Sequence, residues 1–216
     1  MGHTHHTENT RISSQVQRKP VSHPAADALD WDEYLRVVSN LNDDCKYREA
    51  LLLSVGCNLG LRISDILLLK WKDLVGEDVI KITEKKTGKT RTLRINSALK
   101  QEARLCHDEM EITSDDSFVF VAYNNDGSRP LTRVRAHQLL KEIQLQYDIK
   151  SAKVFSTHSL RKTFGRRVWL SESEKGRGET ALVLLSETFG HSSIAITKRY
   201  LGIRQQEILS LYESIL

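Results

Sequence analysis

Two histidines, an arginine and a tyrosine near the end of the sequence carry side chains that could attack a phosphodiester. His158 and Arg161 are three positions apart, so on a helix they lie on one face and can point into one pocket. A planar guanidinium can bind two phosphate oxygens, and imidazole can transfer protons near neutral pH. Tyr200 follows the dipeptide Gly190-His191, and a tyrosine hydroxyl can form a covalent intermediate. The segment therefore offers a nucleophile, proton carriers and a clamp for phosphate oxygens.

A second segment places Arg62 between apolar residues, within Gly60-Leu61-Arg62-Ile63-Ser64-Asp65. A buried guanidinium is costly without a partner. Asp65, three residues further on, is the partner that we expect. Taken alone, the two residues are equally compatible with a structural ion pair that has no part in catalysis.

A β-hairpin with a basic tip is predicted in the next segment. Val79–Thr83 and Thr90–Ile95 alternate apolar and polar residues, and Thr87-Gly88 between them supplies a turn. A two-stranded hairpin of this kind can reach into a groove. Three lysines lie at its tip: Lys85, Lys86 and Lys89.

The order of these motifs resembles the tyrosine recombinase (phage integrase) family. The matching segments are the first-arginine box at 60–67, the lysine-bearing hairpin at 85–91, His-x-x-Arg at 158–161, and Gly190-His191 followed by Tyr200. A lone His-x-x-Arg occurs by chance in many helices, but four motifs in the family's order are specific. The match extends from Leu29 to Tyr200 and covers most of the chain.

The resemblance implies a reaction that needs no metal, nucleotide or other cofactor. The tyrosine attacks a backbone phosphate of DNA, and the 3′-phosphotyrosyl bond keeps the energy of the broken ester for rejoining. Two arginines hold the non-bridging oxygens, a lysine protonates the leaving 5′-oxygen, and two histidines assist. The residues of this sequence that match the family's catalytic positions are Arg62, Lys86, His158, Arg161, His191 and Tyr200.

The identity of the lysine is open between two neighbours. Its place in the sequence Lys-Thr-Gly-Lys favours Lys86. Lys85 is the alternative, because a shift of one residue would exchange the side chain that faces inward.

The expected fold class is α+β, mainly α-helical, with a small antiparallel hairpin, as in the tyrosine recombinase catalytic domain. A chain of 216 residues without a central Pro/Gly/Ser linker predicts one main domain. Residues 1–28 are polar and predict a flexible arm, which leaves residues 29–216 for the catalytic domain. Helices are expected at about 30–41, 47–58, 64–69, 98–110, 134–147, 180–189 and 204–216, with a short strand at 118–123 and a long loop at 171–179.

The C-terminal helix, within residues 203–216, carries an apolar stripe. Ile208, Leu211, Tyr212 and Ile215 are three or four positions apart. A stripe of this kind is buried either on its own domain or, as often in the family, on a neighbouring subunit, and the sequence leaves both alternatives open.

Composition adds weaker constraints. The formal net charge of +4 permits a nucleic-acid partner without requiring one, whereas the basic clusters at 85–94 and 161–167 could each neutralise phosphates. His3, His5 and His6 have no further ligands nearby, so no metal site is expected. Three cysteines without a Cys-x-x-Cys motif, and no long apolar or signal segment, predict a cytoplasmic protein that does not enter a membrane.

The resemblance also implies partners. These are double-stranded DNA, other copies of the chain in a homo-oligomer (a tetramer) assembled on that DNA, and accessory DNA-bending proteins. Most relatives carry a further helical domain before the catalytic one, and residues 1–28 are too short to form it, so weaker and less specific DNA binding is expected. Two other functions would use similar residues: relaxation of supercoils by a type IB topoisomerase, and DNA binding without catalysis.

Overall fold

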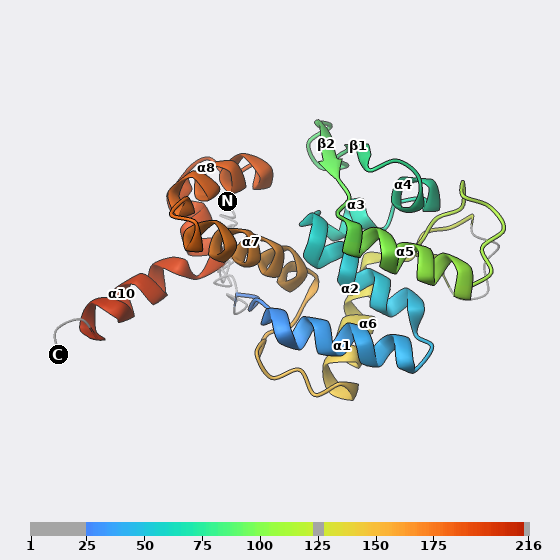
Figure 1. Cartoon of the computed structure of the whole chain (residues 1–216), viewed down its shortest axis with the longest axis horizontal. Coiled ribbons are helices and arrows are strands. Elements are labelled where there is room, and N and C mark those ends of the chain that lie inside the picture. The colour runs from blue at the N-terminus through green and yellow to red at the C-terminus, as the bar shows by residue number, and fades with distance from the viewer. Residues whose placement is uncertain (1–24, 123–127, 214–216) are drawn as a thin grey trace, which may run out of the picture.

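The computed structural model describes residues 25–122 and 128–213, except for the side chains of 204–207. The expected mainly helical α+β fold with one antiparallel hairpin is confirmed (Figure 1). The predicted arm before residue 25, the three N-terminal histidines and Ile215 lie outside the described residues. In chain order the elements are α1 (Trp31–Asp43), α2 (Tyr47–Leu59), α3 (Ile63–Ile66), α4 (Trp71–Val75), β1 (Val79–Thr83), β2 (Thr90–Arg94), α5 (Ser97–Glu109), α6 (Arg133–Gln146), α7 (Thr157–Glu174), α8 (Gly178–Phe189), α9 (Ile194–Leu201) and α10 (Ile203–Glu213).

Helix α2 runs through the main hydrophobic core and contacts α1, α5 and α7. Its sequence is apolar on nearly every side, as expected for a buried helix, and Leu51, Leu52 and Leu53 are fully buried. Each such side chain contributes about 1.5–3 kcal/mol to folding. At Gly56 an added Cβ would lie 2.6 Å from the side chain of Leu160. This glycine therefore lets α7 approach α2 closely and sets the position of the first turns of α7.

A second, smaller core joins α7, α8, α9 and the start of α10. It consists of Leu182, Leu185, Phe189, Leu201 and Ile203, and the partly buried side chains of Phe164 and Tyr200 pack against it. In Figure 1 the labels of α8 and α10 lie beyond α7, on the side opposite α5. The two cores thus lie on either side of α7.

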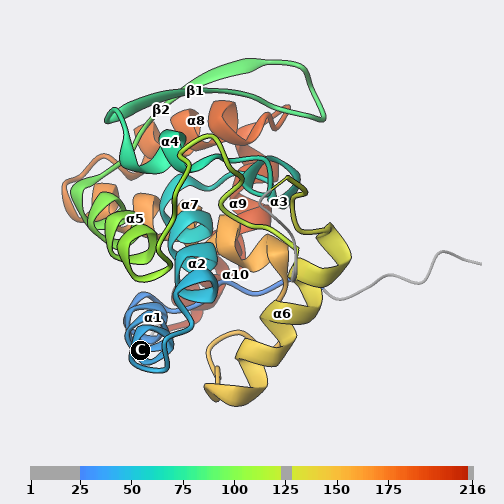
Figure 2. The same ribbon diagram turned by 90° about the vertical axis from the view of Figure 1, so that its right-hand side faces the viewer.

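The hairpin pairs β1 with β2 in antiparallel register, with Ile80 opposite Leu93 and Ile82 opposite Arg91. The connecting residues turn at Gly88, whose φ of +66° is a conformation that favours glycine. Figure 2 shows the hairpin extending across one side of the molecule, beside α8 and α4.

Two expectations about connecting segments were wrong. No long loop spans residues 171–179, because α7 continues to Glu174 and α8 begins at Gly178. The turn between them is held by Glu172, whose backbone and side-chain oxygens both accept hydrogen bonds from Arg177, each at 2.7 Å. The helix end faces solvent, so its low apolar content does not mark a loop.

The strand expected at 118–123 is also absent from the described part of that segment. Residues 118–122 form only single bridges, between Lys70 and Phe118 and between Val121 and Pro130. Proline has no N–H to donate, so it cannot continue a ladder of hydrogen bonds. The predicted turn at 124–127 lies outside the described residues.

Helix α10 projects from the body of the protein in Figure 1. Ile203 at its start is fully buried, whereas Ile208, Leu209 and Tyr212 are 39%, 53% and 71% exposed, and Leu211 of the predicted stripe is 64% exposed. No helix in the described ranges combines the length and apolar character needed to cross a membrane.

Candidate active site

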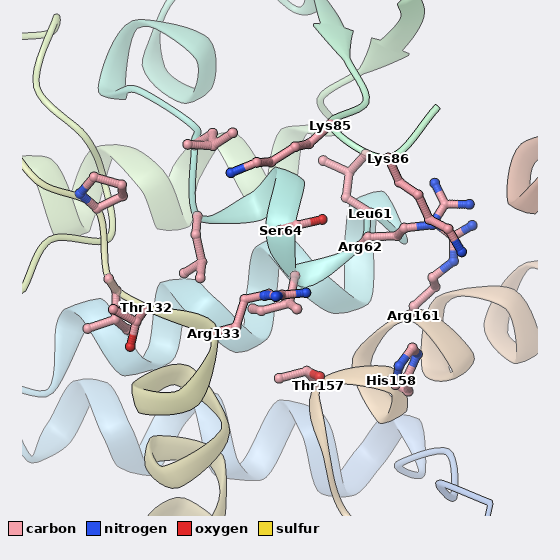
Figure 3. Close-up of a pocket in the computed structure, with 15 residues that line it drawn as sticks. Leu61, Arg62, Ser64, Lys85, Lys86, Thr132, Arg133, Thr157, His158 and Arg161 are labelled. Atoms are coloured by element: carbon pink, nitrogen blue, oxygen red, sulfur yellow. The ribbon is translucent and has the colours of Figure 1, made fainter. Parts of the chain in front are cut away.

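A basic cavity of about 620 Å³ lies between α3, the hairpin and the start of α7 (Figure 3). Among the described residues that line it there is no aspartate or glutamate. An anionic ligand would therefore meet attraction from several sides and no opposing carboxylate on the wall. The basic side chains of the lining are Arg62, Lys85, Lys86, Arg133, His158 and Arg161.

Arg161 is held by backbone carbonyls at the ends of two helices. The side chain, from α7, is only 5% exposed. Its Nη1 donates to the carbonyl of Gly60 at 2.5 Å, its Nη2 donates to the carbonyl of Phe189 at 3.1 Å, and its Cζ lies 4.3 Å from the centre of the Phe189 ring. Carbonyls at a helix C-terminus carry partial negative charge and compensate the buried cation. Burial lowers the pKa of Arg161 to about 10, so the group remains charged at neutral pH.

Arg62 shares one of these acceptors but has a different ion-pair partner from the one expected. Its Nη2 donates to the Phe189 carbonyl at 3.3 Å, and its Nη1 pairs with Glu84 at 2.8 Å. The predicted partner, Asp65, instead accepts the backbone N–H of Lys85 at 3.0 Å. Arg62 is the extended N-cap residue of α3 (φ −70°, ψ 146°), so the helical three-residue spacing does not bring its side chain to Asp65.

Glu84 is a further residue of the site, which the sequence motifs did not predict. It is 5% exposed, directly follows β1, and pairs with Arg91 at 3.0 Å as well as with Arg62. The alternation of β1 contains the signal that could have found it: Ile80 and Ile82 are its less exposed positions, and the same period of two places Glu84 inward. A carboxylate at an inward position requires a cationic or hydrogen-bonding partner.

The two candidate lysines both line the cavity but point in different directions. In Figure 3 Lys86 extends toward the guanidinium groups of Arg62 and Arg161, whereas Lys85 extends away from them, over Ser64. The direction of the two side chains therefore favours Lys86 as the lysine that reaches a phosphate bound by the two arginines.

The two basic clusters expected to neutralise phosphates are only partly directed at the cavity. In the hairpin, Arg91 pairs with Glu84. On α7, Lys162 donates to the carbonyl of Ala26 at 2.9 Å, and Arg167 stacks over the ring of Trp31 at 4.9 Å. These cations help to hold the fold.

Both candidate histidines are neutral near pH 7. Burial, with the positive charges of Arg161 and Arg62, lowers the pKa of His158 and of His191 below the ordinary value of 6.5. His191 has its Nδ1 2.9 Å from the hydroxyl oxygen of Thr197. A neutral imidazole can accept a proton, which is the role that a tyrosine nucleophile requires of a neighbour.

Tyr200, on α9, lies beside these histidines but does not line the basic cavity. Its ring is 5.3 Å from that of His191, and its hydroxyl donates to the carbonyl of His158 at 3.4 Å. It lines an adjacent cavity of about 790 Å³, and His158 lines both cavities. Burial raises the pKa of Tyr200 to about 12, although Arg161 and Arg62 act in the opposite direction. The phenol is thus protonated in the free protein, and it lies close enough to both guanidinium groups for their charge to lower its pKa.

Four of the six predicted catalytic residues therefore share one cavity: Arg62, Lys86, His158 and Arg161. Tyr200 reaches this group through its hydrogen bond to His158, and His191 packs against the Tyr200 ring. The arrangement combines two arginines, a lysine, two imidazoles and a phenol, which are side chains that can bind a phosphate, transfer protons and act as a nucleophile.

Comparison with known proteins agrees with the fold. The phage integrase family model matches residues 27–207. The chain is 31% identical over 166 residues to the probable integrase/recombinase YoeC of Bacillus subtilis strain 168, covering 77% of this chain and 83% of that protein. It is 28% identical over 188 residues to the tyrosine recombinase XerC of Xanthomonas axonopodis pv. citri, covering 86% of this chain and 57% of that protein.

The chain belongs to the phage integrase family, a family of site-specific tyrosine recombinases. Solved structures of recombinases share its fold. The XerA recombinase superposes with a TM-score of 0.65 at 19% identity, covering 89% of this chain and 66% of that one. The XerH recombinase bound to its difH substrate, in the post-cleavage complex, gives 0.62 at 20% identity, covering 87% and 53%. The chain thus spans between about half and two thirds of the length of these solved relatives.

Proposed function

We propose that this chain is the catalytic domain of a site-specific recombinase that cuts and rejoins double-stranded DNA through a covalent bond between Tyr200 and a 3′-phosphate. The observation that carries the proposal is the pair of guanidinium groups, Arg62 and Arg161, that share the Phe189 carbonyl in a cavity whose described lining has no carboxylate. A phosphodiester is the anion that suits two adjacent guanidinium forks beside a buried phenol.

The proposed reaction balances without a metal or cofactor. The Tyr200 oxygen attacks phosphorus, the bond from phosphorus to the 5′-oxygen breaks, and the phenol proton passes to a neutral histidine. Lys86 gives a proton to the leaving 5′-oxygen. Arg62 and Arg161 neutralise the two non-bridging oxygens, where charge increases in the transition state, and loss of one such donor costs on the order of 10² to 10³ in rate. Attack by a 5′-hydroxyl of another strand reverses these steps and joins the strands.

We further propose that the protein acts in the cytoplasm, as a homotetramer assembled on DNA, with accessory DNA-bending proteins. The solved complex of XerH with its difH substrate supports DNA as a partner. The exposed apolar side chains of α10 support assembly, because helix faces of this kind are commonly covered by a partner.

Removal of one hydroxyl tests the nucleophile. Tyr200→Phe should bind DNA with unchanged affinity but form no covalent adduct on a nicked suicide substrate, because the ring remains packed while the attacking oxygen is lost. Tyr212→Phe is the matched control, since Tyr212 is 71% exposed on α10, and it should form the adduct at the normal rate. An adduct that survives Tyr200→Phe would disprove the assignment. Relaxation of plasmids without strand exchange by the unaltered protein would indicate a topoisomerase instead.

A further inference from the structure

The Glu84 carboxylate joins three segments of the candidate active site. Its Oε2 accepts from Arg62 Nη1 at 2.8 Å and from the hydroxyl of Thr87 at 2.7 Å, and its Oε1 pairs with Arg91 Nη1 at 3.0 Å. These donors come from the start of α3, the hairpin tip and β2. One buried side chain therefore connects the arginine clamp to the loop that carries the lysines.

The contact with Arg62 determines how its guanidinium is oriented. One terminal nitrogen is held by Glu84 and the other by the Phe189 carbonyl, at 2.8 Å and 3.3 Å. With both nitrogens held, the plane of the fork is defined before any ligand binds. A guanidinium has five N–H groups, so donors remain for a phosphate.

The contact with Thr87 acts on the lysine. Thr87 directly follows Lys86, and its hydroxyl is bonded to the same carboxylate oxygen that holds Arg62. The backbone N–H of Gly88 adds a hydrogen bond to the Glu84 carbonyl at 2.8 Å. The tip of the hairpin is thus tied to the position of Arg62 on both sides of Lys86.

We infer that Glu84 is a positioning residue that fixes Arg62 and Lys86 relative to each other, so that both reach the same phosphodiester. The inference rests on the proposed function. Glu84 does not line the basic cavity. Its negative charge is paired with Arg62 and Arg91 and does not face the phosphate.

The carboxylate stays ionised for this role. Burial raises the pKa of Glu84, but the hydrogen bonds from Thr87 and Arg62 and the charge of Arg91 outweigh burial and lower the pKa overall. A buried ion pair often contributes little net stability, because desolvation offsets the attraction. A role in orientation explains the pair better than a role in stability.

The decisive variant is Glu84→Gln, which keeps the shape of the side chain and removes its charge. We expect adduct formation to fall about 10- to 100-fold, the range found when partners that orient metal ligands are removed. Glu102→Gln is the matched control: Glu102 accepts hydrogen bonds from Asn42 at 3.0 and 3.2 Å, in a contact between α5 and α1 away from the cavity. This control should form the adduct at the normal rate.

Two altered DNA substrates separate positioning from a general loss of folding. A 5′-bridging phosphorothiolate has a leaving group that needs no proton, so it should restore the part of the defect that comes from a displaced Lys86. A methylphosphonate at the cleavage site lacks one charged non-bridging oxygen, so it should restore the part that comes from a displaced Arg62. Each should bring Glu84→Gln several-fold closer to the unaltered protein measured on the same DNA. If neither does, Glu84 acts only through the fold and the inference is overturned.

A measurement without DNA keeps the inference separate from the proposed function. If the unaltered protein forms no Tyr200 adduct on any substrate, the proposed function fails, but the orientation of Arg62 can still be followed through the ¹⁵N resonances of its side chain. Glu84→Gln should shift these resonances and speed their hydrogen exchange, and Glu102→Gln should leave them unchanged. Unaltered Arg62 resonances in Glu84→Gln would contradict positioning by Glu84.

Discussion

The two arginines of the candidate site share one backbone carbonyl, that of Phe189, and differ in their other partner. Arg161 bonds to the carbonyls of Gly60 and Phe189 and has no carboxylate among its hydrogen-bond partners in the described structure. Carbonyl dipoles orient the guanidinium without cancelling its full charge. The carboxylate that pairs with Arg62, that of Glu84, does not line the cavity. The clamp therefore keeps its positive field for an incoming phosphate.

Substitution of each of the two lysines at the hairpin tip should have a different effect on adduct formation. Lys86→Ala should reduce adduct formation on ordinary DNA by at least 100-fold, within the range of general acid catalysis, and a 5′-bridging phosphorothiolate should restore most of the loss. Lys85→Ala is the matched control, since its side chain points away from Arg62 and Arg161 in Figure 3. It should show a small defect on either substrate. Rescue of Lys85→Ala together with no rescue of Lys86→Ala would move the role by one residue.

Local sequence signals predicted well the helices and the hairpin that position the site. The alternation of β1 and the helices expected at 47–58 and 180–189 are local features, and the structure confirms them as β1, α2 and α8. Gly60 and Gly190, which end the two helices, have φ values of +59° and +65°. The order of the catalytic motifs likewise predicted which side chains would meet, and Arg62, Lys86, His158 and Arg161 do line one cavity.

The choice of partners was harder to predict, because it depends on tertiary contacts. Asp65 is three residues from Arg62, yet Glu84, twenty-two residues away, is the ion-pair partner. Sequence spacing predicts contacts only within a regular helix, and Arg62 lies at the extended residue before one. The Phe189 carbonyl, which both arginines share, has no side-chain signature and could not be found from the sequence.

The end of α2 gives a test at this scale. At Gly60 an added Cβ would lie 2.2 Å from the Phe164 ring and φ is +59°, whereas Gly176 has a similar φ of +73° and nothing within 4 Å. Gly60→Ala should therefore lose roughly 1–2 kcal/mol from backbone strain and about 1–3 kcal/mol more from overpacking. Gly176→Ala should lose only the free energy that comes from backbone strain. Thermal unfolding measures both, at about 2–4 °C per kcal/mol for a chain of this size.

Gly60→Ala should also slow adduct formation, because the Gly60 carbonyl accepts the hydrogen bond from Arg161. The Gly176 control should not be slowed. Equal melting temperatures for the two variants would mean that Phe164 moves aside without cost, and the close approach would then not constrain the end of α2.

At the scale of the whole molecule, the clamp and the nucleophile are attached to different cores. Arg62 and the hairpin adjoin the main core, whereas Tyr200 packs on the small core with Phe189 and Leu201. Arg161 connects the two cores, because it lies on α7 and donates a hydrogen bond to the carbonyl of Phe189, a residue of the small core. The small core has only five fully buried side chains among the described residues. A change in α10, which begins in this core, can therefore alter the position of Tyr200 relative to the hairpin, which adjoins the main core.

Helix α10 can dock on its own domain or on a neighbouring subunit. Its described side chains differ in exposure: Ile203 is fully buried, while Ile208 and Tyr212 are 39% and 71% exposed. Deletion of residues 204–216 should therefore change the melting temperature of the monomer little, but abolish cooperative assembly on DNA and the cleavage that depends on it. Docking on a neighbour would then hold Tyr200 in line with the phosphate only in the assembled state.

A deletion one residue longer, which also removes Ile203, is the matched control. Loss of a buried isoleucine costs about 2–5 kcal/mol, so this variant should melt several degrees lower even as a monomer, while the shorter deletion should not. Melting curves of the two monomers, together with gel-shift titrations on DNA, separate packing from assembly. A drop of several degrees already in the shorter deletion would show that α10 packs on its own domain, and intact cooperative assembly in that variant would equally rule out docking on a neighbour.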